Sequence, residues 1–171
     1  GELSPLELAG GFSVFANGGY KVDTHFIQRI QDMNGKVLFE ADPVVACVSC
    51  EMQKRGKAMP VSAEAVIESG LPKQAGRVVE DRIVYVMNSM LQDVINNGTA
   101  RRARALGRND LMGKTGTTNE QRDAWFNGFN RSMVAIAWVG FDDQKKILGA
   151  SETGGKAALP MWMEFMRTAL Q

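Results

Sequence analysis

The sequence has little of the chemistry that metal and redox sites require. Its 171 residues include two cysteines and one histidine, which are too few to build a four-ligand zinc site in the usual way. The cysteines, Cys47 and Cys50, form a lone C-x-x-C outside any thioredoxin-like pattern. We interpret them as a structural or incidental pair, or as a short disulfide if the compartment is oxidising. Neither a metal nor a cofactor is therefore expected.

Long apolar runs and an excess of charge are also missing. The apolar runs are about as long as a buried strand, so none of them is expected to span a bilayer. No charged region followed by an apolar stretch opens the chain, so we expect no export signal within it. A formal net charge of +1, with 44% hydrophobic and 23% charged residues, argues against disorder and against a nucleic-acid partner. This composition and length fit one globular domain.

Helical signals occur at three places. Ser4 and Glu7 form a capping box with proline at the first helical position, which predicts a helix over residues 5–17. Residues 80–96 carry apolar side chains at the i, i+3, i+4, i+7 spacing of an amphipathic helix. The same kind of spacing predicts a last helix over residues 156–169.

Strand signals lie between these helices. The Asn34-Gly35 dipeptide predicts a hairpin between "HFIQRIQD" and "KVLFE", and three further β-type runs follow later: "LMGKTGTT", "DAWFNGFN" and "SMVAIAWVGFD". Successive strands with short turns indicate an antiparallel sheet, and the flanking helices make the fold class α+β. We expect the hairpin to belong to the same sheet or its margin. Residues 41–78 have the composition of an irregular, mobile loop.

The stretch "GRNDLMGKTGTTNE", around Lys114, fits two different motifs. The first is the phosphate-binding loop G-x-x-x-x-G-K-[ST], in which backbone N–H groups and the start of a helix surround phosphates. Here five residues instead of four separate Gly107 from Gly113, and Arg108 stands where the first glycine is required. The residues after Lys114 are β-branched or glycine, a poor first turn of a helix. The phosphate-binding interpretation is therefore rejected.

In the second motif, Lys-Thr-Gly lies on a strand that lines a cleft. Lys114 would supply a fixed positive charge beside a nucleophile, and Gly116 would let a ligand approach the backbone closely. Strand alternation places Thr115 and Thr117 on the same face, so both hydroxyls can meet one anionic group. Gly154-Gly155, ahead of the last predicted helix, is a candidate for a loop beside this cleft.

The context of this motif resembles a known family. The stretch "GTARRARALGRNDLMGKTGTTNEQRDAWFNGFN" is similar to the C-terminal part of the transpeptidase domain of class A (bifunctional) penicillin-binding proteins. "LSPLELAGGFSVFANGGY" resembles the helix after the family's second motif, and "TGGKAALPMWMEFM" its closing loop and helix. The three stretches occur in the family's order along the chain, and residues 41–78 match less distinctly. The resemblance implies the fold of penicillin-binding proteins and serine β-lactamases, an antiparallel sheet with flanking helices.

The resemblance also implies a reaction. In this family the serine of an S-x-x-K motif attacks the D-Ala–D-Ala bond of a peptidoglycan stem peptide, and the acyl group passes to an amine of a neighbouring stem. β-Lactams imitate the donor and trap the acyl-enzyme. By analogy Lys114 and Thr117 are catalytic: the lysine tunes the electrostatics, and the Thr117 N–H is half of the oxyanion hole. Thr115, Gly116, Thr117 and Thr118 would bind the substrate, with the Thr115 and Thr117 hydroxyls on the donor carboxylate.

The sequence departs from the family at the nucleophile. None of its eight serines has a lysine three residues on or an asparagine two residues on, so neither S-x-x-K nor S-x-N is present. We expect residues 1–171 to be the C-terminal portion of one transpeptidase domain, inactive alone, whose partner is an upstream segment with both motifs. The resemblance places the site on the periplasmic face of the inner membrane, with the anchor upstream. The alternative is a non-catalytic binding or interaction domain of the same fold.

Overall fold

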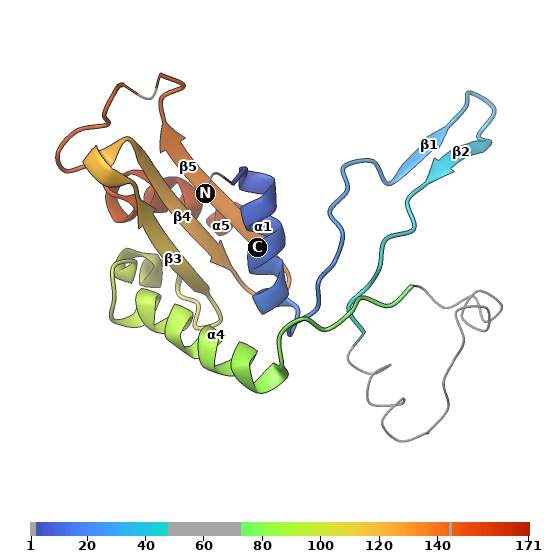
Figure 1. Ribbon diagram of the computed structural model, residues 1–171, viewed down its shortest axis with the longest axis horizontal. Helices are drawn as coiled ribbons and strands as arrows, with labels where there is room; N and C mark the ends of the chain where they lie inside the picture. Colours follow the sequence, from blue (N-terminus) through green and yellow to red (C-terminus); the bar gives the residue numbers. More distant parts are fainter. Residues whose placement is uncertain (1–2, 48–72, 144) are drawn as a thin grey trace.

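The structure, a computed structural model, describes residues 3–47, 73–143 and 145–171. The larger sheet has three strands, and Figure 1 shows it with helices on both faces and with a separate hairpin that projects from this body. In chain order the elements are α1 (Pro5–Ala16), β1 (Arg29–Gln31), β2 (Val37–Glu40), α4 (Asp81–Asn96), the 3₁₀ helix η1 (Arg101–Leu106), β3 (Met112–Thr117), the 3₁₀ helix η2 (Asn119–Gln121), β4 (Asp123–Phe129), β5 (Val134–Gly140), the π-helical turn η3 (Gly154–Ala158) and α5 (Leu159–Ala169).

All three predicted helices are present. At the start of α1 the Ser4 hydroxyl accepts a hydrogen bond from the Glu7 N–H (3.3 Å), and Glu7 Oε2 accepts one from the Ser4 N–H (2.7 Å), which is the predicted capping box. The backbone N–H of Ser4 is the main cause of a lowered pKa at Glu7. Helix α4 buries three apolar residues of its predicted stripe, Val84, Leu91 and Ile95. The last helix differs at its start, because the π turn η3 precedes α5.

Strands β3, β4 and β5 form one antiparallel sheet in that order, so the predicted α+β fold class is confirmed. The central strand β4 pairs residue for residue with both neighbours: Phe126 stands opposite Thr115 of β3 and Ala137 of β5. Strand β3 is therefore an edge strand, and within the described residues its outer edge has no strand partner. Helix α4 packs against this strand.

The predicted hairpin is present, but its expected place in the larger sheet is wrong. In the described part of the chain β1 and β2 pair only with each other, and they project from the body (Figure 1). The turn follows the prediction: Gly35 has a φ of 82°, and the Asp32 carboxylate accepts hydrogen bonds from the N–H groups of Asn34 and Lys36, both 2.9 Å long. Every residue of both strands is exposed, so no buried face holds the hairpin against the other sheet.

The irregular stretch predicted over residues 41–78 is described only at its two ends. There neither helix nor strand forms, and Val45 and Gln74 make an isolated parallel bridge. Cys47 is disulfide-bonded, whereas Cys50 lies outside the described residues. The prediction for residues 48–72 likewise falls outside the part of the chain that the structure describes.

The core lies between α5 and one face of the sheet. Trp162 of α5 packs edge-on against Phe126 of β4 with ring centroids 4.9 Å apart, and its indole N–H donates to the carbonyl oxygen of Ala135 (3.1 Å). Both rings are at most 1% exposed, and burial of an aromatic side chain of this kind contributes about 1.5–3 kcal/mol. On the opposite face Phe12 of α1 contacts Phe129, with centroids 6.0 Å apart.

Gly128 of β4, beneath the Trp162 ring, is expected to tolerate no side chain. An added Cβ would lie 2.4 Å from Trp162 Cζ2 and 2.8 Å from Phe126 Cε1, so Gly128→Ala must displace both rings. We expect this overpacking to lower the free energy of unfolding by about 1–3 kcal/mol, measured by urea denaturation followed through tryptophan fluorescence. Gly11→Ala is the control, because a Cβ there meets nothing within 4 Å and alanine favours the helix. Equal stability of the two variants would contradict this packing.

Candidate active site on strand β3

The four residues of the K-T-G-T motif all lie on the edge strand β3, and strand alternation divides them between its two faces. Thr115 and Thr117 stand opposite Phe126 and Ala124 of β4. Directly opposite residues of an antiparallel pair share a face, and both of these partners are fully buried, with Phe126 against Trp162 of α5. The predicted common face of the two threonines is confirmed, and it is the face that α5 covers.

Lys114 and Gly116 take the opposite face, where their cross-strand partners are Asn127 and Trp125. The Lys114 side chain is exposed, and its Nζ donates to the carbonyl oxygen of Thr115 at 2.8 Å. The ammonium thus lies against the main chain of its own strand. Because the sheet separates its two faces, lysine and threonines can reach one ligand only around the open edge of β3.

Each of the two threonine hydroxyls has a partner outside β3. Thr115 Oγ1 lies 2.8 Å from Oγ1 of Thr99, in the segment after α4. Thr117 Oγ1 accepts a hydrogen bond of 3.1 Å from the N–H of Gly154, the first residue of η3. The sequence pointed to Gly154 as part of a loop beside the cleft, but no local pattern in it marks Thr99.

The approach of η3 to the sheet requires glycine at the first position of that turn. A Cβ on Gly154 would lie 2.3 Å from the carbonyl oxygen of Trp125 and 2.5 Å from that of Gly116, far inside van der Waals contact. These neighbours are main-chain atoms of paired strands, which cannot move aside as the end of a flexible side chain can. Glycine is therefore the residue that can bring its N–H this close to Thr117 Oγ1.

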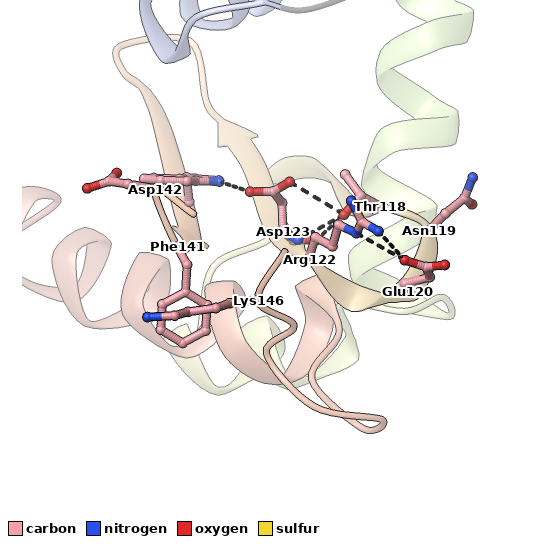
Figure 2. A pocket seen from close by; sticks show the side chains of 9 residues that line it. Thr118, Asn119, Glu120, Arg122, Asp123, Phe141, Asp142 and Lys146 are labelled. Carbon is pink, nitrogen blue, oxygen red and sulfur yellow. Dashed lines mark hydrogen bonds and ion pairs between the residues drawn. The ribbon is translucent and has the colours of Figure 1, made fainter. Parts of the chain in front are cut away.

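Thr118 follows the strand and has a different environment (Figure 2). Its Oγ1 accepts a hydrogen bond from the Asp123 N–H at 2.8 Å, and its own N–H donates to the carbonyl oxygen of Asp123 at 3.1 Å. Asp123 Oδ1 in turn accepts a hydrogen bond of 2.9 Å from the indole N–H of Trp138. The structure thus gives Thr118 a turn-closing contact between β3 and β4, and its contact with substrate stays a prediction.

A cleft of about 660 Å³ lies beside this turn, at the end of the sheet. Figure 2 shows Arg122 paired with Glu120 on one wall. On the other wall Lys146 Nζ lies 5.8 Å from the centre of the Phe141 ring, and Asp142 adds a carboxylate. The cleft therefore carries both signs of charge around exposed aromatic surface, and it is not a dedicated site for a strongly charged ligand of either sign.

In the described ranges no three His, Cys, Asp or Glu side chains come together as possible ligands of a metal ion. No helix of those ranges has both the length and the apolar character needed to cross a membrane. The groups that β3 offers to a ligand are an ammonium, hydroxyls and backbone N–H groups.

The chain is similar to known proteins along nearly its whole length. Residues 2–166 match the family described as the penicillin binding protein transpeptidase domain. Penicillin-binding protein 1A of Pseudomonas aeruginosa is 44% identical over 190 residues, which cover 99% of this chain and 23% of that protein. Penicillin-binding protein 1A of Neisseria gonorrhoeae is 40% identical over 171 residues, which cover 100% of this chain and 18% of that protein. The chain thus spans about a fifth of the length of the curated relatives that it matches.

Solved structures agree with the predicted fold. The crystal structure of penicillin-binding protein 1A from Haemophilus influenzae matches with a TM-score of 0.83 and 36% identity, over 99% of this chain and 26% of that one. The structure of penicillin-binding protein A from M. tuberculosis matches with a TM-score of 0.61 over 99% of this chain and 32% of that one. At 18% identity this second similarity shows a shared fold alone.

Thr118→Val is expected to loosen the connection between β3 and β4, because valine keeps the shape of threonine and loses the oxygen that accepts the Asp123 N–H. We expect the free energy of unfolding to fall by about 0.5–1.5 kcal/mol, the usual net value of one hydrogen bond. Urea denaturation measures this change, and Thr118→Ser, which keeps the hydroxyl, is the control. A Thr118→Val protein as stable as the serine variant would show that the contact does not hold the turn.

Proposed function

The chain belongs to the penicillin-binding protein transpeptidase family, and on that premise we propose that it forms part of a peptidoglycan D,D-transpeptidase that acts through a serine acyl-enzyme. In this proposal the chain supplies the K-T-G-T wall of the active site. The nucleophile and the S-x-N motif lie on an upstream segment of the same protein, so the chain alone is inactive. β-Lactam antibiotics inhibit the protein by acylating that serine.

The observation that carries the proposal is the pair of threonine hydroxyls on β3. Thr117 Oγ1 already accepts the Gly154 N–H, so its own proton is free for an acceptor on a ligand. Thr115 lies on the same face two residues away, and the exposed ammonium of Lys114 lies on the same strand. Two O–H donors and one ammonium at the open edge of a strand suit an anionic group of the size of a carboxylate.

The donor stem peptide ends in D-Ala–D-Ala, and its terminal carboxylate is this anionic group. With the carboxylate held by Thr115 and Thr117, the carbonyl carbon of the scissile bond faces the serine of the upstream segment. Serine attack forms a tetrahedral intermediate, and the Thr117 N–H stabilises its oxyanion while Lys114 keeps the local potential positive. The peptide bond then breaks, D-alanine leaves with a proton, and an acyl-enzyme ester remains.

The second half of the reaction transfers the acyl group. An amine of a neighbouring stem peptide attacks the ester carbonyl, the bond to the serine oxygen breaks, and the serine recovers its proton. The same oxyanion contact serves both steps, because each passes through a tetrahedral intermediate at the same carbon. The product is an amide cross-link between two stems.

Two observations support a nucleophile outside residues 1–171. No serine of the chain stands in an S-x-x-K or S-x-N motif, and the chain covers only 18% to 23% of the curated relatives. We place the whole protein at the inner membrane with the transpeptidase site on the periplasmic face and the anchor outside this chain.

Lys114→Ala is expected to lower the rate of covalent labelling by a fluorescent penicillin about 100-fold or more, the usual effect of removing one group that stabilises charge in the transition state. The measurement uses the full-length protein, a time course of labelling and a gel readout. Lys36→Ala is the matched control, because Lys36 is exposed in the turn of the hairpin that projects from the body (Figure 1), and we expect it to label at the wild-type rate.

The two possible failures of this experiment have different meanings. If the unaltered full-length protein takes no label at any penicillin concentration, the transpeptidase proposal is wrong and the non-catalytic binding domain replaces it. If the wild-type protein takes label and Lys114→Ala takes it equally fast, the family's activity holds and the role given to Lys114 is wrong.

A further inference from the structure

We infer that Thr99 is a positioning residue of this site: its hydroxyl donates to Thr115 Oγ1 and so leaves the Thr115 proton for the carboxylate of the donor or of a β-lactam. The inference rests on the proposed function and adds a residue from outside the K-T-G-T motif. Thr99 and Thr115 are joined by an Oγ1–Oγ1 distance of 2.8 Å, a length at which either oxygen can be the donor.

The direction of this hydrogen bond decides what Thr115 can do. A threonine hydroxyl has one proton and two acceptor positions. If Thr115 donates to Thr99, it has no proton left for a ligand. If Thr99 donates, Thr115 can donate to a carboxylate, which when ionised is an acceptor only. Binding of a carboxylate therefore selects the arrangement in which Thr99 is the donor.

At Thr117 the direction of the corresponding hydrogen bond is certain. Its partner is the main-chain N–H of Gly154, which can only donate. Thr117 Oγ1 therefore accepts a hydrogen bond on the face of the sheet that α5 covers, and its own proton stays free. With Thr99 as donor, the Thr115 hydroxyl also accepts one hydrogen bond and keeps its own proton. Both threonine hydroxyls on this face of β3 can then donate to one ligand.

The backbone around Thr99 holds its side chain in place. Gly98 lies so close to the last turn of α4 that an added Cβ would be 2.8 Å from Val94 Cα. The N–H of Ala100 donates to the carbonyl oxygen of Val94 at 3.0 Å, and Ala100 is fully buried. Both neighbours of Thr99 are therefore tied to the end of α4, so the hydroxyl is presented by a rigid element.

The turn η3 packs against this arrangement from the other side. A Cβ on Gly155 would lie 2.9 Å from the carbonyl oxygen of Thr99 and 3.8 Å from Thr115 Cγ2. Thr99, Thr115 and Gly155 thus form one packed group, and the adjacent Gly154 holds Thr117. The direction of the hydrogen bonds at Thr115 and Thr117 is thus set by two segments far apart in the sequence, the end of α4 and the start of η3.

The test is Thr99→Val in the full-length protein, with acylation rates for benzylpenicillin and for its methyl ester. Valine keeps the shape of threonine and removes the donor, so we expect acylation by the free acid to fall about 10-fold, a typical cost of one misdirected hydrogen bond in a binding site. Thr99→Ser keeps the hydroxyl and is expected to restore most of the rate.

The ester separates positioning from a general structural effect. It has no ionised carboxylate, so a hydrogen bond that its carbonyl accepts from Thr115 is only the weaker neutral kind, and Thr99→Val should slow its acylation clearly less than that of the free acid. The acid-to-ester rate ratio within each variant does not depend on the folded fraction, so partial unfolding cannot imitate the result. In the double variant Thr99→Val/Thr115→Val, the acid rate should be no lower than in Thr115→Val alone, because the two hydroxyls act through one contact.

Three results would overturn the inference. Acid and ester rates that fall by the same factor would assign Thr99 a structural role only. A wild-type rate in Thr99→Val would remove any role in acylation. Additive losses in the double variant would show that Thr99 does not act through Thr115. Failure of the proposed function looks different, because then the unaltered protein is acylated by neither compound.

Discussion

The close approach of η3 and α5 to strands β3 and β4 is the constraint on which the rest of the structure depends. Two glycines make it possible: Gly128 lets the Trp162 ring rest on β4, and Gly154 lets η3 rest on the main chain of Gly116. The first contact completes the aromatic core. The second brings a backbone N–H to Thr117 Oγ1. Because η3 and α5 form one continuous segment, the same packing against the sheet sets both the aromatic core and the direction of the hydrogen bond at Thr117.

The edge position of β3 is what the proposed chemistry of the motif requires. In a central strand, both rows of main-chain groups would pair with neighbouring strands, and side chains on opposite faces would never meet. At an edge, one row of N–H and C=O groups stays available to an extended ligand, and side chains from both faces can reach around the strand. In the proposed reaction, Lys114 on one face and the threonine pair on the other need such an edge to act on one substrate.

Local structure could be predicted from the sequence wherever neighbouring residues determine it. The capping box at Ser4, the apolar stripe of α4 and the alternation of β3 each arise within a few residues, and each is present in the structure. The place of the hairpin was predicted wrongly, because alternation within a strand is the same whichever sheet it joins. Thr99 could not be found at all: its contact with Thr115 joins segments whose proximity depends on how α4 packs against β3.

Exposed apolar surface on two helices fits the proposal that another segment completes the active site, and this argument does not depend on the missing serine motif. Helix α1, "PLELAGGFSVFA", is mostly apolar, yet its residues are at best half-buried, and Leu6 is exposed. Helix α4 also exposes large apolar side chains, namely Ile83, Tyr85, Val86 and Met90. Self-contained domains bury such helix faces, and large exposed apolar patches mark surfaces that a partner covers. In the proposed protein, an upstream segment packed on these helices would bury their exposed apolar side chains. The same segment would bring the serine of the S-x-x-K motif opposite β3.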